Sequence, residues 1–251
     1  MMHELDEESS RPVIHVGVDI GQVVDKSTIA VARLTSKDVG NTRTVWQWAK
    51  TRTMTGLRRI SRQVEVPDLA TCYEFLLFAS VPLGTRYKDV AHKVLNVGCD
   101  KRFASSDVHI FVDRTGHRPI FEEMEDELPR RGCPHPVTLH PIQFTGGDSY
   151  DQARGSLSKE YLASRLTLLF EQGLVKFPKG AREVWELKRQ LAVYEGRKNE
   201  RTGNSQYGAF QSGTHDDLVT CVGLATLDPM REELEWLSSD LVEALQAYRG
   251  Y

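Results

Sequence analysis

The stretch VIHVGVDIG, residues 13–21, decides how the rest of the sequence is interpreted. It is short, rich in β-branched residues and bounded by Pro12 and Gly21, a pattern typical of a buried strand. Asp19 does not fit that pattern, because it puts a carboxylate inside an otherwise apolar strand. Burying an unpaired charge is costly, so an acid here indicates that a cation or a hydrogen-bond donor lies beside it.

Two more strands are expected directly after this one. Residues 28–34 form a second apolar run, and residues 42–50 alternate apolar and polar side chains as a half-exposed strand does. Short links join the three runs, so they predict an antiparallel meander at the start of the fold. Residues 107–113 and 137–144 have the same apolar character and are expected to form later strands.

Helical patterns separate and follow the later strands, which indicates an α/β fold. The expected helices cover residues 85–98, 118–132, a segment opened by Ser158, 181–194 and 214–226. The stretch 196–213 is polar and rich in glycine and basic residues, and it is expected to be the longest loop. Residues 229–248 are amphipathic and acidic, as in a terminal helix packed on the outside.

The composition excludes a disordered or fibrous protein, because 40% of the 251 residues are hydrophobic and 27% are charged. The net charge of −3 is unevenly distributed: residues 1–10 carry four acidic and no basic side chains, and residues 227–251 carry six acidic and two basic ones. Between them, residues 151–211 are identified as the most basic segment, with eleven Lys or Arg against seven Asp or Glu. An excess of basic residues between acidic ends is compatible with phosphate contacts. Such an excess more often reflects a surface that simply faces solvent.

The sequence predicts a cytoplasmic protein with reduced thiols. No stretch reaches the roughly 20 apolar residues that cross a bilayer, and the acidic N-terminus lacks the features of a signal peptide. The cysteines include no C-x-x-C pair, so neither a disulfide framework nor a zinc ribbon is indicated. They are Cys72, Cys99, Cys133 and Cys221.

Three aspartates occupy positions where an acid is unusual. Asp19 interrupts the first strand, Asp113 ends a later one, and Asp217 lies in the first turn of the helix 214–226. Converging carboxylates repel one another, and a divalent cation removes that penalty; oxygen ligands without a cysteine or histidine cluster favour Mg²⁺ or Mn²⁺. Each acid also has an ordinary interpretation, as a strand end, an Asx turn or a helix cap respectively.

Helix geometry distinguishes the adjacent acids Asp216 and Asp217, because neighbouring positions lie about 100° apart around a helix. Asp217 borders the apolar stripe of its helix and is the better metal ligand. Asp216 is a candidate for an outer shell or a second metal. His215 either orients a water, contacts a phosphate or simply lies on the surface.

In order and spacing, these motifs resemble the C-terminal nuclease domain of phage large terminases, which has an RNase H-like, or RuvC-like, fold. The motifs are GVDIG at 17–21, VDRTG at 112–116, IQFTGG at 142–147, YGAF at 207–210 and HDDLV at 215–219. The resemblance implies a mixed β-sheet, antiparallel in its first three strands and then parallel, flanked by helices. It divides the chain into an acidic flexible tail at 1–12, a nuclease domain at 13–226 and a C-terminal amphipathic helix at 227–251.

The resemblance also implies an activity: metal-dependent endonucleolytic cleavage of double-stranded DNA with low sequence specificity, in phage genome packaging. Asp19, Asp113 and Asp217 would be catalytic and, with Asp216, would bind two Mg²⁺ or Mn²⁺ ions for phosphodiester hydrolysis. His215 and Arg114 would be auxiliary residues. DNA contacts would come from Lys159, Arg197, Lys198 and Arg201.

A packaging motor would have to come from elsewhere, because these 251 residues contain no G-x-x-x-x-G-K-[ST] phosphate loop. The sequence leaves open whether this is a stand-alone protein or an excised domain. The expected partners are therefore double-stranded DNA and a separate packaging ATPase, portal or small terminase, with no membrane. A phage-encoded chain would work in the cytoplasm of its bacterial host.

Three other interpretations stay open. A Holliday-junction resolvase of the same superfamily would prefer branched DNA and would dimerise. An actin-like or sugar-kinase-like ATP-binding protein is suggested because GVDIG followed by a strand also resembles the first phosphate loop of that superfamily. A non-catalytic docking module would use the acidic termini to bind a basic partner.

Overall fold

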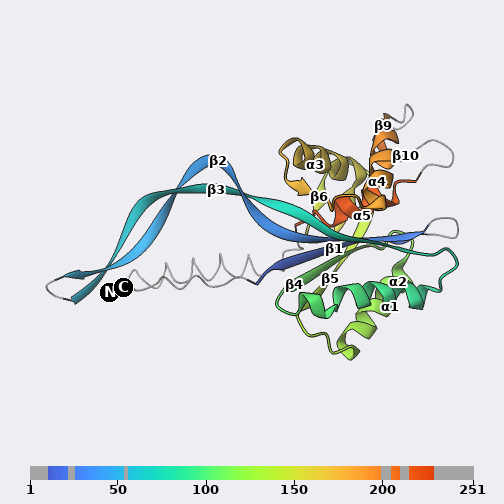
Figure 1. Ribbon diagram of the computed structural model, residues 1–251, viewed down its shortest axis with the longest axis horizontal. Helices are drawn as coiled ribbons and strands as arrows, with labels where there is room; N and C mark the ends of the chain where they lie inside the picture. Colours follow the sequence, from blue (N-terminus) through green and yellow to red (C-terminus); the bar gives the residue numbers. More distant parts are fainter. Residues whose placement is uncertain (1–10, 22–25, 54–55, 199–204, 210–214, 229–251) are drawn as a thin grey trace.

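The computed structural model describes residues 11–21, 26–53, 56–198, 205–209 and 215–228, and its centre is an eight-stranded mixed sheet (Figure 1). Its strand order is β6-β7-β5-β4-β1-β2-β3-β8. These strands are Val13–Asp19 (β1), Ser27–Thr53 (β2), Gly56–Val81 (β3), Asp107–Asp113 (β4), Val137–Thr145 (β5), Tyr150–Asp151 (β6), Ser156–Ser158 (β7) and Val175–Lys176 (β8).

The pairing confirms the expected fold class. The first three strands are antiparallel to one another, and β4 and β5 then add in parallel beside β1. The helices are Tyr87–Gly98 (α1), Arg118–Glu127 (α2), Lys159–Glu171 (α3), Arg182–Val193 (α4) and Asp217–Leu224 (α5), with short 3-10 turns at Lys101–Phe103 and Leu128–Arg130.

The sheet separates two apolar layers, because successive side chains of a strand point to opposite faces. Ile14, Val16 and Val18 of β1 pack with buried side chains of α1 and α2 on one face. The opposite face carries α3, α4 and α5, whose buried leucines pack with Phe75 and Phe111. Figure 1 shows the same arrangement, with α1 and α2 below the sheet and α3, α4 and α5 above it.

Gly17 allows α5 to lie directly on β1. A Cβ atom at this position would be 1.9 Å from the carbonyl oxygen of Cys221 and 2.6 Å from the backbone nitrogen of Ala225. A side chain of any size would therefore force the helix away from the strand. This close approach brings the beginning of α5 to the end of β1.

The second and third strands differ from those expected. Residues 28–34 and 42–50 belong to a single strand, β2, and the third strand of the antiparallel set is β3. The polar link between the two runs contains Gly40, and a glycine in such a link predicts a turn. Gly40 does have a positive φ of +80°. In the structure it is an irregularity between Asp38 and Thr42, beyond which pairing with β3 resumes.

The stretch 196–213 is only partly the loop that was expected. Parts of it belong to two antiparallel strands that form a separate small sheet. These strands are Tyr194–Lys198 (β9) and Ser205–Ala209 (β10). Tyr207, at the start of the YGAF motif, lies in β10 opposite Gly196. The acidic tail at 1–12, apart from its last two residues, and the amphipathic helix expected at 227–251, apart from its first two, fall outside the described residues.

The expectation of four reduced thiols is wrong for one pair. Cys99 and Cys133 form a disulfide across a sequence separation of 34, while Cys72 and Cys221 are free and buried. Sequence spacing alone did not indicate the pair, because the fold brings it together: His135 Nε2 shares a hydrogen bond with the Gly98 carbonyl oxygen (2.7 Å), which ties the end of α1 to the segment after α2.

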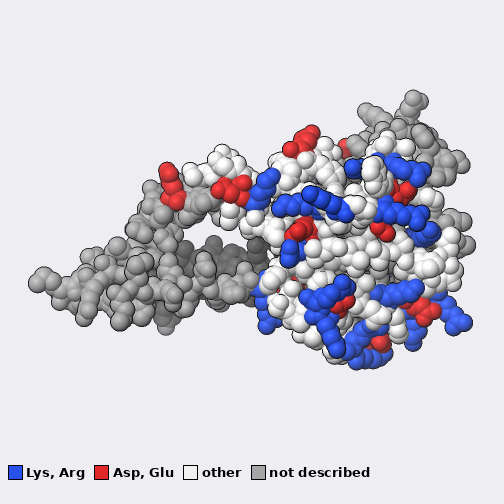
Figure 2. All heavy atoms as spheres, viewed as in Figure 1, with Lys and Arg blue, Asp and Glu red and all other residues white. Residues whose placement is uncertain are grey.

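The body has charges of both signs on the face shown in Figure 2, where Lys and Arg side chains are interspersed with Asp and Glu. No helix among the described residues is long and apolar enough to cross a membrane.

Candidate active site: a pocket lined by four carboxylates

The four acids singled out in the sequence line one pocket of about 260 Å³. Asp19 ends β1 and Asp113 ends β4. These strands are adjacent and parallel, so their carboxyl ends meet at the same edge of the sheet. Asp216 is the N-cap residue of α5, and Asp217 is the first residue of that helix. The other lining residues are Ile20, Gly21, Thr115, His117, Phe144, Lys159 and Thr220.

The beginning of α5 is held at this edge by two hydrogen bonds. The Leu218 backbone N–H donates to Gln190 Oε1 (2.9 Å), and Thr28 Oγ1 donates to the Asp217 carbonyl oxygen (3.0 Å). Thr28 pairs with Asp19 across β1 and β2. The same strand pair therefore places the first acid and holds the helix that supplies the last two.

The electrostatics at Asp19 show how crowded the carboxylates are. Burial raises the pKa of Asp19 well above its usual range, and the neighbouring charges of Asp113, Asp217 and Asp216 raise that pKa further. Lys159 acts in the opposite direction. Negative charge is thus concentrated where a cation would be favoured.

Asp113 is oriented by its own chain. The Thr115 backbone N–H donates to Asp113 Oδ1 (2.8 Å), which is the Asx turn considered from the sequence. Thr115 Oγ1 in turn accepts a hydrogen bond from the Phe144 backbone N–H (2.8 Å). Burial raises the pKa of Asp113, and the hydrogen bonds from Thr115 partly oppose that rise. The turn and a role in the pocket are therefore compatible.

Lys159, expected from the sequence as a DNA contact, lies within the pocket. Its Nζ donates to Asp216 Oδ2 (3.0 Å) and lies 5.7 Å from the centre of the Phe144 ring. Ser158, one residue earlier, caps α3 by accepting a hydrogen bond from the Tyr161 N–H (3.0 Å). The start of α3 thus places a cation beside the acids of α5.

The chemistry of the pocket fits a hard divalent cation, although its acids are not arranged as a finished coordination shell. Carboxylate oxygens are the ligands that Mg²⁺ and Mn²⁺ prefer, and the four acids crowd one another as such ligands do. Within the described part of the chain, no three or more His, Cys, Asp or Glu side chains form a group that could hold an ion.

The remaining predicted residues lie in different places. His215 is exposed and lines a neighbouring groove together with Asp217, rather than the carboxylate pocket. Arg114 follows Asp113 but is not among the described lining residues of either space, and its buried Nε has no hydrogen-bond partner among the residues that the structure describes. Arg197 and Lys198 belong to β9. Arg201 lies outside the described residues.

The groove beside the pocket was not anticipated from the sequence. It has a volume of about 630 Å³, shares Asp217 with the pocket, and includes Lys26, Arg182 and Arg189 in its lining. Trp185, also in the lining, is 66% exposed, and Lys188 Nζ lies 4.9 Å from the centre of its ring. An exposed tryptophan in the amphipathic helix α4 was the signal that could have identified this groove.

No protein-family model and no curated protein matches the chain. Among solved structures, it is similar to the human cytomegalovirus terminase nuclease domain, Mn soaked and inhibitor bound, at 9% sequence identity and a TM-score of 0.45. The match covers 87% of this chain and 83% of that chain. At this identity and TM-score the likeness concerns the course of the chain and carries no conclusion about activity.

Proposed function

We propose that this chain is a metal-dependent endodeoxyribonuclease of the terminase type, which hydrolyses phosphodiester bonds of double-stranded DNA with low sequence specificity during phage genome packaging. The observation that carries the proposal is the convergence of Asp19, Asp113, Asp216 and Asp217 in one pocket, from two parallel strands and one helix. Acids that serve only the fold are usually spread apart or paired with cations, whereas the charges of Asp113, Asp216 and Asp217 together raise the pKa of Asp19.

The acids of the pocket would hold two Mg²⁺ or Mn²⁺ ions, with Asp19, Asp113 and Asp217 as the main ligands and Asp216 as an auxiliary one. When bound, such a pair supplies an activated water and stabilises the leaving oxygen. The chain's own residues prepare this site. Thr115 fixes the orientation of the Asp113 carboxylate, and Lys159 holds Asp216 while offsetting part of the negative charge.

The adjoining groove supplies a path for a nucleic-acid strand to the pocket. Lys26 and Arg182 can contact phosphates, as can Arg189 if it leaves its ion pair with Glu186 (3.0 Å), and the exposed ring of Trp185 offers a stacking surface for a base. Neither kind of contact reads base edges, so cleavage is expected at many sequences. Binding through phosphates is also expected to weaken as salt rises.

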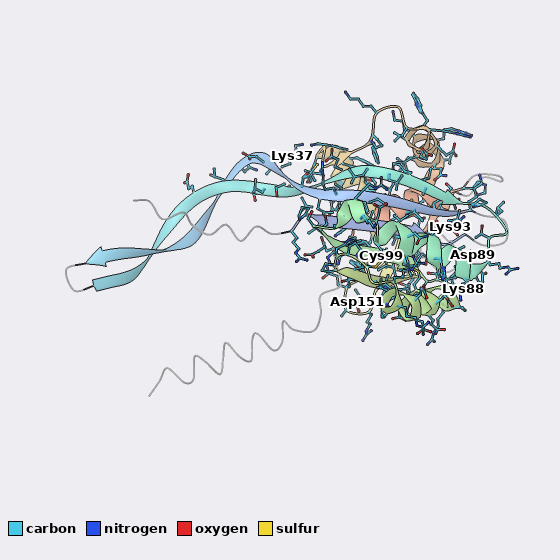
Figure 3. All side chains as sticks on the ribbon, turned by 60° about the horizontal axis from the view of Figure 1, so that its bottom comes forward. Lys37, Lys88, Asp89, Lys93, Cys99 and Asp151 are labelled. Atoms are coloured by element: carbon cyan, nitrogen blue, oxygen red, sulfur yellow. A yellow bond between two sulfur atoms is a disulfide. The ribbon has the colours of Figure 1, made fainter. Side chains whose placement is uncertain are left out.

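Nicking of supercoiled plasmid in Mn²⁺ tests the proposal. Asp113→Asn keeps the size of the side chain but removes its charge, so nicking should fall below detection while the circular dichroism spectrum is unchanged. Asp89→Asn is the matched control, because Asp89 is an exposed acid in the first turn of α1 (Figure 3), and it should nick like the parent. A folded Asp113→Asn protein that nicks at the parental rate would refute the proposal.

Substrate choice tests the terminase type separately from nuclease activity. Cleavage of unbranched duplex at least as fast as cleavage of a four-way junction supports it. A strong preference for the junction would point instead to a resolvase.

A further inference from the structure

The strands β2 and β3 continue beyond the sheet as a two-stranded arm. β1 pairs with residues 28–33 of β2, and β8 pairs with residues 73–74 of β3. Farther out, the two strands pair with each other as far as Thr53 and Gly56. Figure 1 shows this ribbon projecting well away from the body. We define the arm as residues 39–53 of β2 and 56–68 of β3.

The base of the arm is fixed to the body. Lys37 Nζ donates to the carbonyl oxygens of Gln172 (3.2 Å) and Gly173 (3.1 Å), directly after α3. Figure 3 shows Lys37 where the ribbon leaves the body. Since the strand pairing is continuous through this point apart from the irregularity between Asp38 and Thr42, the arm is an extension of the central sheet.

The arm has an unusual charge for a chain whose net charge is −3. Residues 39–64 contain six Lys or Arg and no Asp or Glu, and the two acids of the arm, Glu65 and Asp68, follow at its base. Residues 39–64, and not 151–211, are therefore the most basic part of the sequence. The six are Arg43, Lys50, Arg52, Arg58, Arg59 and Arg62. Trp46 and Trp48 lie in the same segment.

The backbone register of the arm pairs basic residues of the sequence with each other. Lys50 is paired directly with Arg59. Like charges directly opposite each other destabilise an antiparallel pair, and no acid in residues 39–64 offsets them. The positive charge of this ribbon therefore favours the binding of a polyanion.

We propose that the arm is a second duplex-DNA contact, distant from the carboxylate pocket. A two-stranded ribbon fits the major groove of B-DNA, and lysine and arginine bind its phosphates. The fifteen residues from 39 to 53 span about 50 Å, more than one turn of the double helix. The arm leaves the end of the sheet opposite to the pocket, because Asp19 pairs with Thr28 and Ile14 with Arg33.

The arm therefore contacts DNA away from the carboxylate pocket and raises the affinity of the protein for its substrate. The choice of DNA rests on the proposed function; the charge and placement of the arm do not.

The test is the affinity of the full chain for a labelled 40-base-pair duplex, measured by fluorescence anisotropy at several salt concentrations. Asp113→Asn is present throughout to prevent cleavage. K50Q/R52Q/R58Q/R59Q removes four positive charges from the arm. K88Q/K93Q/K101Q/R118Q removes four from exposed positions on and near α1 and α2, where Figure 3 shows Lys88 and Lys93 on the body. Circular dichroism and thermal melting confirm that each variant folds.

The arm variant should bind the duplex at least about tenfold more weakly than the parent, and the slope of log Kd against log salt should fall by about 3. The control should stay within about twofold of the parent in Kd. The pair K50Q/R59Q should weaken binding by a smaller factor without lowering the melting temperature, because it removes a repulsive cross-strand pair.

Parental affinity in the arm variant, or an equal loss in the control, would overturn the proposal. So would tighter binding of duplex RNA than of duplex DNA by the parent. Plasmid nicking distinguishes these failures from failure of the proposed function. If only the arm proposal is wrong, the parent still nicks plasmid and Asp113→Asn still does not.

Discussion

Lys159 is expected to matter more to the proposed nicking activity than to the stability of the fold. Its ion pair with Asp216 is partly exposed, with 37% of the lysine side chain accessible, so it contributes less than about 1 kcal/mol to folding. The same Nζ offsets negative charge at Asp19. Lys159→Gln should therefore reduce plasmid nicking about tenfold or more while leaving the melting temperature nearly unchanged.

Lys159→Arg should retain part of the activity, because the positive charge is kept. Lys93→Gln, an exposed change on α1, is the control and should nick like the parent. Full activity in Lys159→Gln would show that the cation plays no part in the site.

His15 makes the protein sensitive to acid. Burial lowers the pKa of His15 to about 3, with His109 lowering it further, while the carbonyl oxygen of Ala225 lies 3.2 Å from Nδ1. In the unfolded chain the His15 side chain becomes protonated below about pH 6.5, whereas in the folded chain it stays neutral until much lower pH. The free energy of unfolding should therefore fall as the pH drops from 6.5 toward 3, by several kcal/mol in all.

His15→Phe removes the pH-dependent loss of stability that protonation of His15 causes. The phenylalanine ring can pack in the same apolar surroundings, where the Phe111 ring centroid lies 5.0 Å from that of His15. Urea unfolding at pH 8, 6 and 5 should show a shallower loss of stability in the variant. Some loss will remain because burial also lowers the pKa of His140 to about 4. Identical pH profiles for variant and parent would rule out this role for His15.

The three main acids could be identified from the sequence because each interrupts a local pattern. Asp19 lies in an apolar strand, and Asp217 borders an apolar stripe. The Lys159–Asp216 pair and the groove around Trp185 could not be identified in this way, since both depend on how α3 and α4 pack against α5. Trp185 in the amphipathic helix was a hint of the groove, but nothing local in the sequence indicated which elements would form it or that Lys159 would meet Asp216.

At the scale of elements, the contact between β1 and α5 positions the site. Gly17→Ala would put a Cβ atom 1.9 Å from a backbone oxygen of α5, so the helix must move. We expect a loss of about 3 kcal/mol in the free energy of unfolding, and reduced nicking because Asp216 and Asp217 move with the helix.

Gly146→Ala is the matched control, because a Cβ atom there meets nothing within 4 Å. Chemical denaturation and plasmid nicking of both variants check the prediction. Parental stability in Gly17→Ala would contradict the close contact between strand and helix.

Elements with one continuous local pattern were predictable, and those that depend on partners were not. The strands β1 and β4 and the helix α1 agree with expectation because their apolar spacing is uninterrupted. The break within β2 was mispredicted, since its polar link with Gly40 resembles a turn and only pairing with β3 keeps it extended. The β9–β10 pair likewise replaces solvation with cross-strand hydrogen bonds in a glycine-rich segment.

For the whole molecule, the Cys99–Cys133 disulfide adds a constraint that depends on redox conditions. Closing a loop across a separation of 34 residues stabilises the folded chain by about 3 to 4 kcal/mol in the chain-entropy model. Reductant should therefore lower the melting temperature by several degrees, and Cys133→Ser should melt at the reduced temperature with or without reductant.

Thiol titration checks the pairing directly. Protein purified without reductant and then denatured should react at two thiols, Cys72 and Cys221, and at four after reduction. Four reactive thiols before reduction would show that the pair is not bonded under those conditions.

Binding of divalent metal by the four converging carboxylates, as proposed for DNA cleavage, is tested most directly by a crystal structure of the full chain grown with Mn²⁺. The data would be collected at a wavelength where manganese scatters anomalously. We predict two anomalous peaks about 3.5 to 4 Å apart, bound by oxygens of Asp19, Asp113 and Asp217. A well-ordered pocket without manganese, at an Mn²⁺ concentration that supports nicking, would contradict the account.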